Sequence, residues 1–213
     1  TELAAHYGVS RTVAREVLGR LDHVGIIRKD SRSHWYLPGL SPERVGELYE
    51  MRWLLEPVAL RKAAPRVPRA VLERIRDEHE AVRDQPGSAR PQDLDRLEQQ
   101  LHVELLSHGD NATLLETLQH YHALLITNAV LYDVTSRGFG ADPFVGEHLA
   151  ILRLVGEGRF DDAAQQLADH LRTARGRAID RIGYMVRNGA LEPLRYLTPL
   201  AEERAAPGRA ASP

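Results

Sequence analysis

The chain has 213 residues, of which 43% are hydrophobic and 27% are charged, and its formal net charge is −2. It is long and apolar enough for one large domain or two small ones, and the patterns below favour two. It contains no cysteine, which excludes disulfides and thiolate metal sites. It also has no apolar run of membrane-spanning length and no signal-peptide pattern, so we predict a cytoplasmic protein without a membrane partner.

The charge is divided unevenly along the chain. Residues 1–40 contain six Lys or Arg against four Asp or Glu, and the remaining residues contain 22 against 26, so the two parts carry +2 and −4. A mildly basic N-terminal part, called the head below, on an acidic remainder suits a protein that contacts DNA through the head. A net charge of +2 does not by itself establish DNA binding.

The head contains a short turn followed by an amphipathic helix, VSRTVAREVLGRL at residues 9–21. Four apolar side chains at helical spacing are expected to pack inward: Val13, Val17, Leu18 and Leu21. Cationic and hydroxyl-bearing side chains crowd the first turn, where free backbone N–H groups favour phosphate: Ser10, Arg11, Thr12 and Arg15. With residues 1–7 as a partner helix and Gly8 at the turn, the pattern predicts a helix-turn-helix whose second helix reads DNA.

Residues 26–37, IIRKDSRSHWYL, predict two short strands around a polar turn, which is the form of a wing. Lys29, Arg32 and His34 are candidate contacts to phosphate or the minor groove, and a solvated hairpin tip is the alternative for each of them. Because the chain starts at Thr1 inside a helical unit without an initiator Met, we expect this winged helix-turn-helix to be incomplete at its start. Breaker residues at 38–42 place the domain boundary between residues 40 and 41.

From residue 41 onward the apolar periodicity is helical throughout, and it predicts an antiparallel bundle of about six helices over residues 41–190. Ser41 is expected to cap the first helix, Asn111 to open the fourth and Asp161 to cap the sixth. A C-terminal tail follows at residues 191–213. The expected helices are 42–64, 71–82, 91–108, 111–132, 143–157 and 161–188.

Glu98 and His102 lie four residues apart and therefore project from the same helix face. His148 and His170 border apolar stripes of the fifth and sixth helices. In a small bundle the four side chains can converge, and one carboxylate with three imidazoles suits a divalent ion such as zinc or nickel. The alternative is that each histidine is a hydrogen-bonded structural residue, which is the commoner situation on residue pattern alone.

Two further residues are candidates for binding a small effector. Arg52 lies close to the inward face of the first bundle helix, where it can bind a ligand carboxylate or form an i, i+4 pair with Glu56. His122 has the helical phase of a pocket residue, with core packing as its alternative. His79 is expected to be an ordinary surface or packing residue.

These segments resemble the GntR family of bacterial transcription regulators, in the FadR branch whose helical C-terminal domain is called FCD. The residues 9–27 resemble the family's VSRTPVREALxxLxxxGLV signature, and LEQQLHVELLSHGDNATLL and GEHLAILRLVGEGRFDDAAQQLADHL resemble its FCD motifs. The resemblance implies that Arg11, Thr12 and Arg15 contact DNA. It also implies metal ligands at Glu98, His102, His148 and His170, with Glu98 standing where the family usually has Asp.

The function that the resemblance implies is a ligand-responsive regulator, not an enzyme, which binds a two-fold symmetric operator in double-stranded DNA as a homodimer. A small effector, expected to be a carboxylate, would bind at the metal and at Arg52. Two other hypotheses stay open at this point. One is a metal-dependent hydrolase built in the bundle; the other is a bundle that serves only for dimerisation and holds no metal.

Overall fold

The computed structural model describes residues 2–36, 38, 41–85, 89–131 and 144–188. Within the described residues, contacts between Cα atoms give two compact units, residues 2–38 and residues 41–188. The expected tail at 191–213 lies outside the described residues. Within the described part of the chain, no helix combines the length and the apolar character needed to cross a bilayer.

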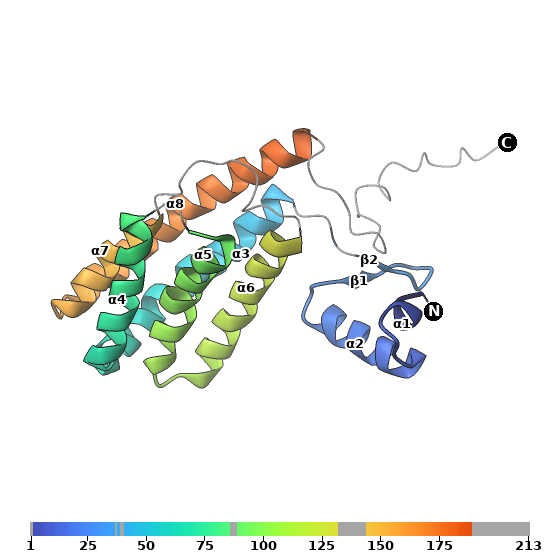
Figure 1. Cartoon of the computed structure of the whole chain (residues 1–213), viewed down its shortest axis with the longest axis horizontal. Helices are drawn as coiled ribbons and strands as arrows, with labels where there is room; N and C mark the ends of the chain where they lie inside the picture. Colours follow the sequence, from blue (N-terminus) through green and yellow to red (C-terminus); the bar gives the residue numbers. More distant parts are fainter. Residues whose placement is uncertain (1, 37, 39–40, 86–88, 132–143, 189–213) are drawn as a thin grey trace. The chain divides into compact units, whose positions relative to one another are not determined.

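The first unit consists of two helices and a hairpin: α1 (Glu2–His6), α2 (Arg11–His23), β1 (Arg28–Lys29) and β2 (Trp35–Tyr36) (Figure 1). Gly8 takes a positive φ of 62° between the helices, which a residue without a side chain adopts at little cost. Ser10 caps α2, because its Oγ accepts a hydrogen bond from Val13 N at 3.2 Å. The unit therefore has the winged helix-turn-helix form expected from the sequence.

The buried face of α2 differs from the expected one. Ala14 is 9% exposed, whereas Val13 and Val17 are 45% and 49% exposed. Leu18 and Leu21 are half-buried, so the inward stripe runs through 14, 18 and 21, at i, i+4 and i+7. The prediction that Val13 and Val17 pack inward is wrong for the described residues, because the side of α2 that is buried is the one that carries Ala14.

The wing is organised by one acidic side chain. Asp30 Oδ1 accepts hydrogen bonds from the backbone N–H groups of Arg32 at 2.9 Å and His34 at 2.7 Å. Ser33 takes φ = 68° at the tip, a conformation for which glycine is the usual residue. The strands pair antiparallel, with Lys29 opposite Trp35.

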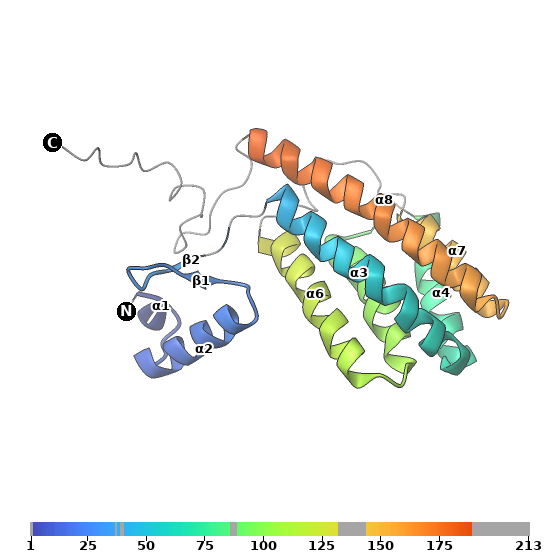
Figure 2. The ribbon, with the colours of Figure 1, turned by 180° about the vertical axis from the view of Figure 1, so that it is seen from behind.

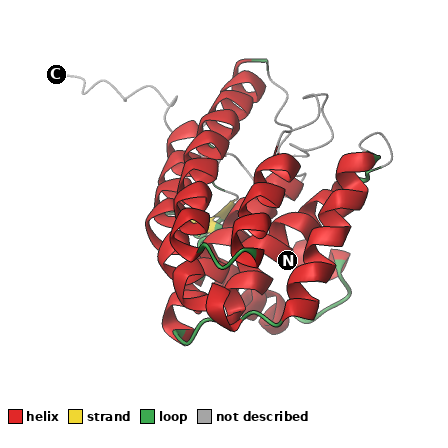
Figure 3. Ribbon diagram, turned by 90° about the vertical axis from the view of Figure 1, so that its left-hand side faces the viewer, coloured by secondary structure: helices red, strands yellow, loops and turns green. Residues whose placement is uncertain are grey.

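Every regular element described in the second unit is a helix (Figure 3). Its elements are α3 (Pro42–Ala63), η1 (Ala64–Arg66), α4 (Arg69–Asp84), α5 (Pro91–Gln99), η3 (Gln100–Glu104), η4 (Leu105–His108), α6 (Ala112–Leu131), α7 (Phe144–Gly156) and α8 (Phe160–Arg187). The two long helices α3 and α8 lie side by side and run antiparallel (Figure 2).

The helix starts agree with the expected caps at two of three places. Ser41 Oγ accepts from Arg44 N at 3.1 Å, with Pro42 at the first position of α3, and Asn111 Oδ1 accepts from Leu114 N at 3.0 Å. Asp161 is not a cap, and that prediction is wrong. Helix α8 starts one residue earlier, at Phe160, and Asp161 Oδ1 instead accepts from Arg61 Nε at 2.8 Å.

The segment expected as one helix over 91–108 has three parts. After α5, η3 is a single π-helical turn in which Leu105 N donates to Gln100 O, and η4 is a 3₁₀ turn. Single π turns inside helices occur frequently at functional sites, because they change the direction in which side chains project. His102 lies within this turn.

The core of the bundle is made by leucine and isoleucine side chains from several helices. Leu60, Ile75, Leu101, Leu105, Ile151, Leu167 and Leu171 are each at most 1% exposed. Burying each such side chain contributes about 1.5–3 kcal/mol, so this cluster holds the helices in register around the polar site described next.

Candidate metal centre

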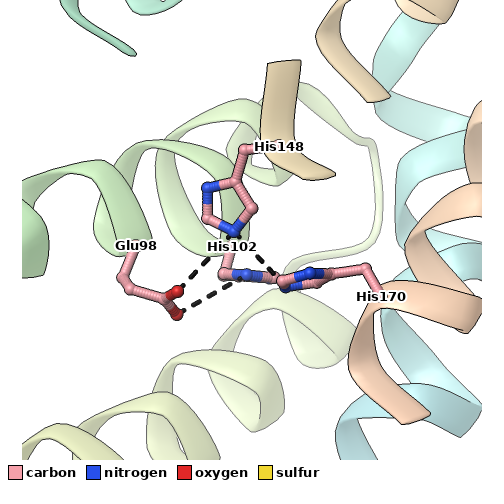
Figure 4. A group of neighbouring side chains, drawn as sticks. All are labelled: Glu98, His102, His148 and His170. Carbon is pink, nitrogen blue, oxygen red and sulfur yellow. Dashed lines mark hydrogen bonds and ion pairs between the residues drawn. The ribbon is translucent and has the colours of Figure 1, made fainter. Parts of the chain in front are cut away.

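Four side chains from four elements meet inside the bundle (Figure 4). Glu98 projects from α5, His102 from η3, His148 from α7 and His170 from α8. One ligand atom from each residue lies within 4.8 Å of the others, so the group could hold a metal ion. The structure thus brings together all four residues that the sequence proposed as ligands.

The separations match the size of a divalent-ion site. His148 Nε2 lies 3.3 Å from His170 Nε2. The two Glu98 oxygens face different histidines, at 3.6 Å from His102 Nε2 and 3.6 Å from His148 Nε2. In a tetrahedral site with bonds of about 2.1 Å the ligand atoms are about 3.4 Å apart. The longer arm of Glu98, compared with Asp, therefore reaches the cluster.

Burial favours the neutral form of His102 and His148, which is the form of imidazole that binds metal. His102, His148 and His170 are 1%, 0% and 4% exposed. Loss of hydration lowers the pKa of both His102 and His148 well below the ordinary value, and the neighbouring positive groups act in the same direction. Their ring nitrogens therefore carry free lone pairs at neutral pH.

Two of the histidines are oriented by buried or half-buried carboxylates. His102 Nδ1 donates to Glu56 Oε2 at 2.5 Å, and Glu56 Oε1 accepts from Arg52 Nε at 2.5 Å. This is the i, i+4 pair that the sequence offered as one alternative for Arg52. His170 Nδ1 donates to Glu147 Oε2 at 2.6 Å. Accepting this bond, together with a two-point contact from Arg177 at 2.9 Å, lowers the pKa of Glu147 to about 2.

The third histidine, His148, contacts the imidazole of His79. His79 on α4 is fully buried, its Nε2 lies 3.1 Å from His148 Nδ1, and its Nδ1 lies 2.8 Å from the backbone oxygen of Ile75. The sequence predicts an ordinary surface or packing residue at His79; the residue is buried, and it also contacts a histidine of the site. In the sequence, the helical spacing of His79 from Ile75 indicates that both side chains lie on one face of the helix. No pattern in the sequence indicates that His79 contacts His148.

The hydrogen-bond partners of the three histidines are those of a set of metal ligands. Each ligand histidine has its Nδ1 engaged by an outer group, so each presents Nε2 to the centre. His102 Nε2 is buried and has no hydrogen-bond partner among the described residues. His148 Nε2 and His170 Nε2 also face the centre, and they lie only 3.3 Å apart. A cation between them satisfies all three nitrogens, and the donor set fits zinc or a similar ion.

A cavity of about 50 Å³ opens beside the cluster, with Glu98, His170 and Arg52 in its lining. Arg52 is 2% exposed, and in the described part of the structure its Nη2 donates no hydrogen bond. A cavity of this size holds about three to five waters, or a small organic anion. A buried guanidinium N–H without a partner next to such a space is a donor that suits a carboxylate oxygen.

His122 lies near His102 and is buried. It is 4% exposed, its ring centroid is 6.3 Å from that of His102, and neither of its nitrogens bonds any described residue. It does not line the cavity beside Glu98. Burial lowers the pKa of His122 to about 4, and the charge of Arg52 acts in the same direction.

All seven side chains that the sequence proposed for DNA contact are exposed on the first unit. Arg11, Thr12 and Arg15 lie on α2, and Ser10 uses its hydroxyl oxygen as the helix cap. On the wing, Lys29 lies over the Trp35 ring at 5.4 Å, and His34 Nδ1 is 3.2 Å from Asp30 Oδ2. Arg32 is at the exposed tip between them.

Comparisons with known proteins match both units. The family model of the FCD domain matches residues 47–173. The Nta operon transcriptional regulator of Aminobacter aminovorans is 27% identical over 191 residues, which are 90% of this chain and 86% of that protein. The uncharacterized HTH-type transcriptional regulator YdhC of Bacillus subtilis is 27% identical over 174 residues, 80% of this chain and 75% of that protein.

A similar arrangement is found in the crystal structure of a transcriptional regulator, a GntR family member, from Pseudomonas syringae pv. tomato. The TM-score is 0.52 at 22% identity, over 86% of this chain and 76% of that chain. At this identity the likeness supports the fold only.

Proposed function

We propose a function from the premise that this chain belongs to the GntR family of transcriptional regulators that carry an FCD domain. Members are transcriptional regulators and not enzymes, so the hydrolase hypothesis is not pursued. The proposed function is a metal-assisted sensor that changes its affinity for operator DNA when a small carboxylate binds in the helical bundle. The observation that carries this proposal is the buried Glu98–His102–His148–His170 cluster beside a cavity lined by Arg52, whose Nη2 has no hydrogen-bond partner among the described residues.

The ion proposed for the cluster is zinc or nickel, because both accept imidazole and carboxylate ligands at the spacing observed. Bound there, the ion would supply a Lewis-acidic position for a ligand oxygen. The protein's part is to hold three imidazoles with their Nε2 atoms inward, through Glu56, Glu147 and His79.

The effector proposed is a small carboxylate in the 50 Å³ cavity. Arg52 Nη2 would donate to it, while Arg52 Nε keeps its bond to Glu56. His122, which does not line the cavity, is proposed as a second polar contact made through water, because both of its buried nitrogens lack a partner among the described residues.

DNA binding is proposed to rest on Ser10, Arg11, Thr12 and Arg15 of α2 with Lys29, Arg32 and His34 of the wing. Two heads of a homodimer would bind the half-sites of a two-fold symmetric operator, in the cytoplasm where the DNA is. Helix α3 is the first element after the head in the chain, and it carries both Arg52 and Glu56. Binding at Arg52 therefore acts on the helix that is joined directly to the DNA-binding unit.

The switch is tested by equilibrium binding to an operator selected from random duplexes, at fixed salt. Zn²⁺ or Ni²⁺ is titrated first, and a set of small carboxylates is then titrated against the metal-loaded protein. We expect at least one carboxylate to change the dissociation constant for DNA by 5-fold or more, about 1 kcal/mol of coupling. His148→Ala should abolish the response, and His120→Ala, a histidine outside the cluster, should keep it.

Two outcomes would refute parts of this proposal. Operator affinity that stays constant under every metal and carboxylate condition would remove the sensing function. Elemental analysis of protein purified without chelators or a histidine tag tests the metal separately. Protein without zinc or nickel that also fails to take up either ion in solution would leave the bundle as a dimerisation body only.

A further inference from the structure

Helix α4 contributes no ligand to the cluster, yet one of its side chains reaches the site. His79 is 0% exposed, and both of its ring nitrogens are engaged, by Ile75 O at 2.8 Å and His148 Nδ1 at 3.1 Å. Because a backbone oxygen only accepts, His79 Nδ1 must carry the proton. In the neutral ring, His79 Nε2 is then the acceptor, and His148 Nδ1 must donate to it.

This chain of bonds decides which nitrogen of His148 faces the centre with a lone pair. The bond to the Ile75 carbonyl fixes the tautomer of His79, and the bond to His79 then fixes the tautomer of His148. In that tautomer His148 Nε2 is unprotonated, and it lies 3.6 Å from Glu98 Oε1. Without an acceptor at position 79, His148 could place its proton on Nε2, where it would block coordination. Ring orientation would also be free to change.

We propose that His79 is a positioning residue of the metal site, which holds His148 as a ligand through an imidazole–imidazole hydrogen bond. The inference rests on the proposed metal-binding function. It gives the site two kinds of support: His102 and His170 are backed by carboxylates, whereas His148 is backed by a neutral ring. A neutral acceptor raises the basicity of its partner less than a carboxylate does, so His148 is the weakest of the three imidazole donors.

The test compares an acceptor-retaining and an acceptor-free substitution at this position. In His79→Gln the amide oxygen can still accept from His148, and in His79→Leu nothing can. Ile75→Val is the matched control, because it removes a methylene group from the same buried helix face and keeps the backbone oxygen. Zn²⁺ affinity is measured by competition with a chelator, and the visible absorption of the Co²⁺-loaded protein reports ligand geometry. Helix content and thermal unfolding of the metal-free proteins are measured alongside.

We expect His79→Leu to weaken Zn²⁺ binding about tenfold or more and to change the Co²⁺ spectrum. The Zn²⁺ affinity of His79→Gln should stay within a few-fold of the wild-type value, and the Zn²⁺ affinity of Ile75→Val should equal the wild-type value. Wild-type affinity in His79→Leu, or an equal loss in His79→Gln and His79→Leu, would overturn the inference. If His79→Leu does not fold, His79→Phe replaces it as the acceptor-free variant. Wild-type protein that binds no divalent ion would instead overturn the proposed function itself.

Discussion

Glu56 offers the sharpest test of how the buried polar network works. It is 1% exposed and accepts both Arg52 Nε and His102 Nδ1 at 2.5 Å. Glu56→Gln removes the negative charge at nearly constant volume and leaves the guanidinium of Arg52, which is 2% exposed, without its carboxylate partner. Breaking one side of a buried ion pair costs about 3–5 kcal/mol, a large part of the total stability of a domain.

The chain contains a matched control with the same residue types and spacing. Arg69 Nε donates to Glu73 Oε1 at 2.7 Å, also at i, i+4, but the two side chains are 90% and 42% exposed. Exposed pairs of this kind are screened by water and contribute little. Glu73→Gln should therefore leave stability almost unchanged, and the difference between the two variants isolates the effect of burial.

The assay is urea unfolding of both variants and wild type in the presence of a chelator, followed by Zn²⁺ competition on the folded proteins. We expect Glu56→Gln to lower the free energy of unfolding by about 3 kcal/mol or more. It should also weaken Zn²⁺ binding about 10–100-fold, because His102 loses its carboxylate. If Glu56→Gln is no less stable than Glu73→Gln and binds Zn²⁺ as wild type does, the reasoning about this network is refuted.

Three further predictions concern single histidines and the DNA-binding helix. His148→Ala should lower metal content while helix content stays close to wild type, as measured by elemental analysis and circular dichroism; the reverse pattern would mean that its role is structural. His122 has its pKa lowered from 6.5 to about 4 in the folded protein. The unfolded chain therefore binds more protons between these values, and stability of the metal-free protein should fall as the pH decreases from 6.5 to 4. The contribution is about 3 kcal/mol in total, and His122→Phe should remove it; equal pH slopes in urea unfolding would contradict it. Arg15→Ala should weaken specific operator binding by ~1–3 kcal/mol if Arg15 reads a guanine. Arg20→Ala is the control, because Arg20 lies on the same helix and pairs with Glu16 at 2.7 Å, and this variant should have little effect on operator binding. Equal losses of operator affinity in the two variants would count against base readout by Arg15.

The sequence by itself determined the helical class of the second unit and the four candidate ligands. Apolar periodicity marks the helices, and the spacing of Glu98 and His102 requires them to share a face whichever helices pack around them. His148 and His170 could be named because each borders an apolar stripe and because the surrounding segments resemble FCD motifs. Ser41 and Asn111 were readable as caps because capping is a local interaction within one turn.

Only the tertiary structure decided what surrounds these ligands. Glu56, Glu147 and His79 contact their histidines across sequence separations of 46, 23 and 69 residues, so their roles depend on which helices pack together and in what rotation. The same holds for Val13 and Val17, which local periodicity placed inward and which are exposed in the structure. Local patterns determine which way a side chain projects from its own helix, but hydrogen-bond partners and burial are properties of the packed bundle.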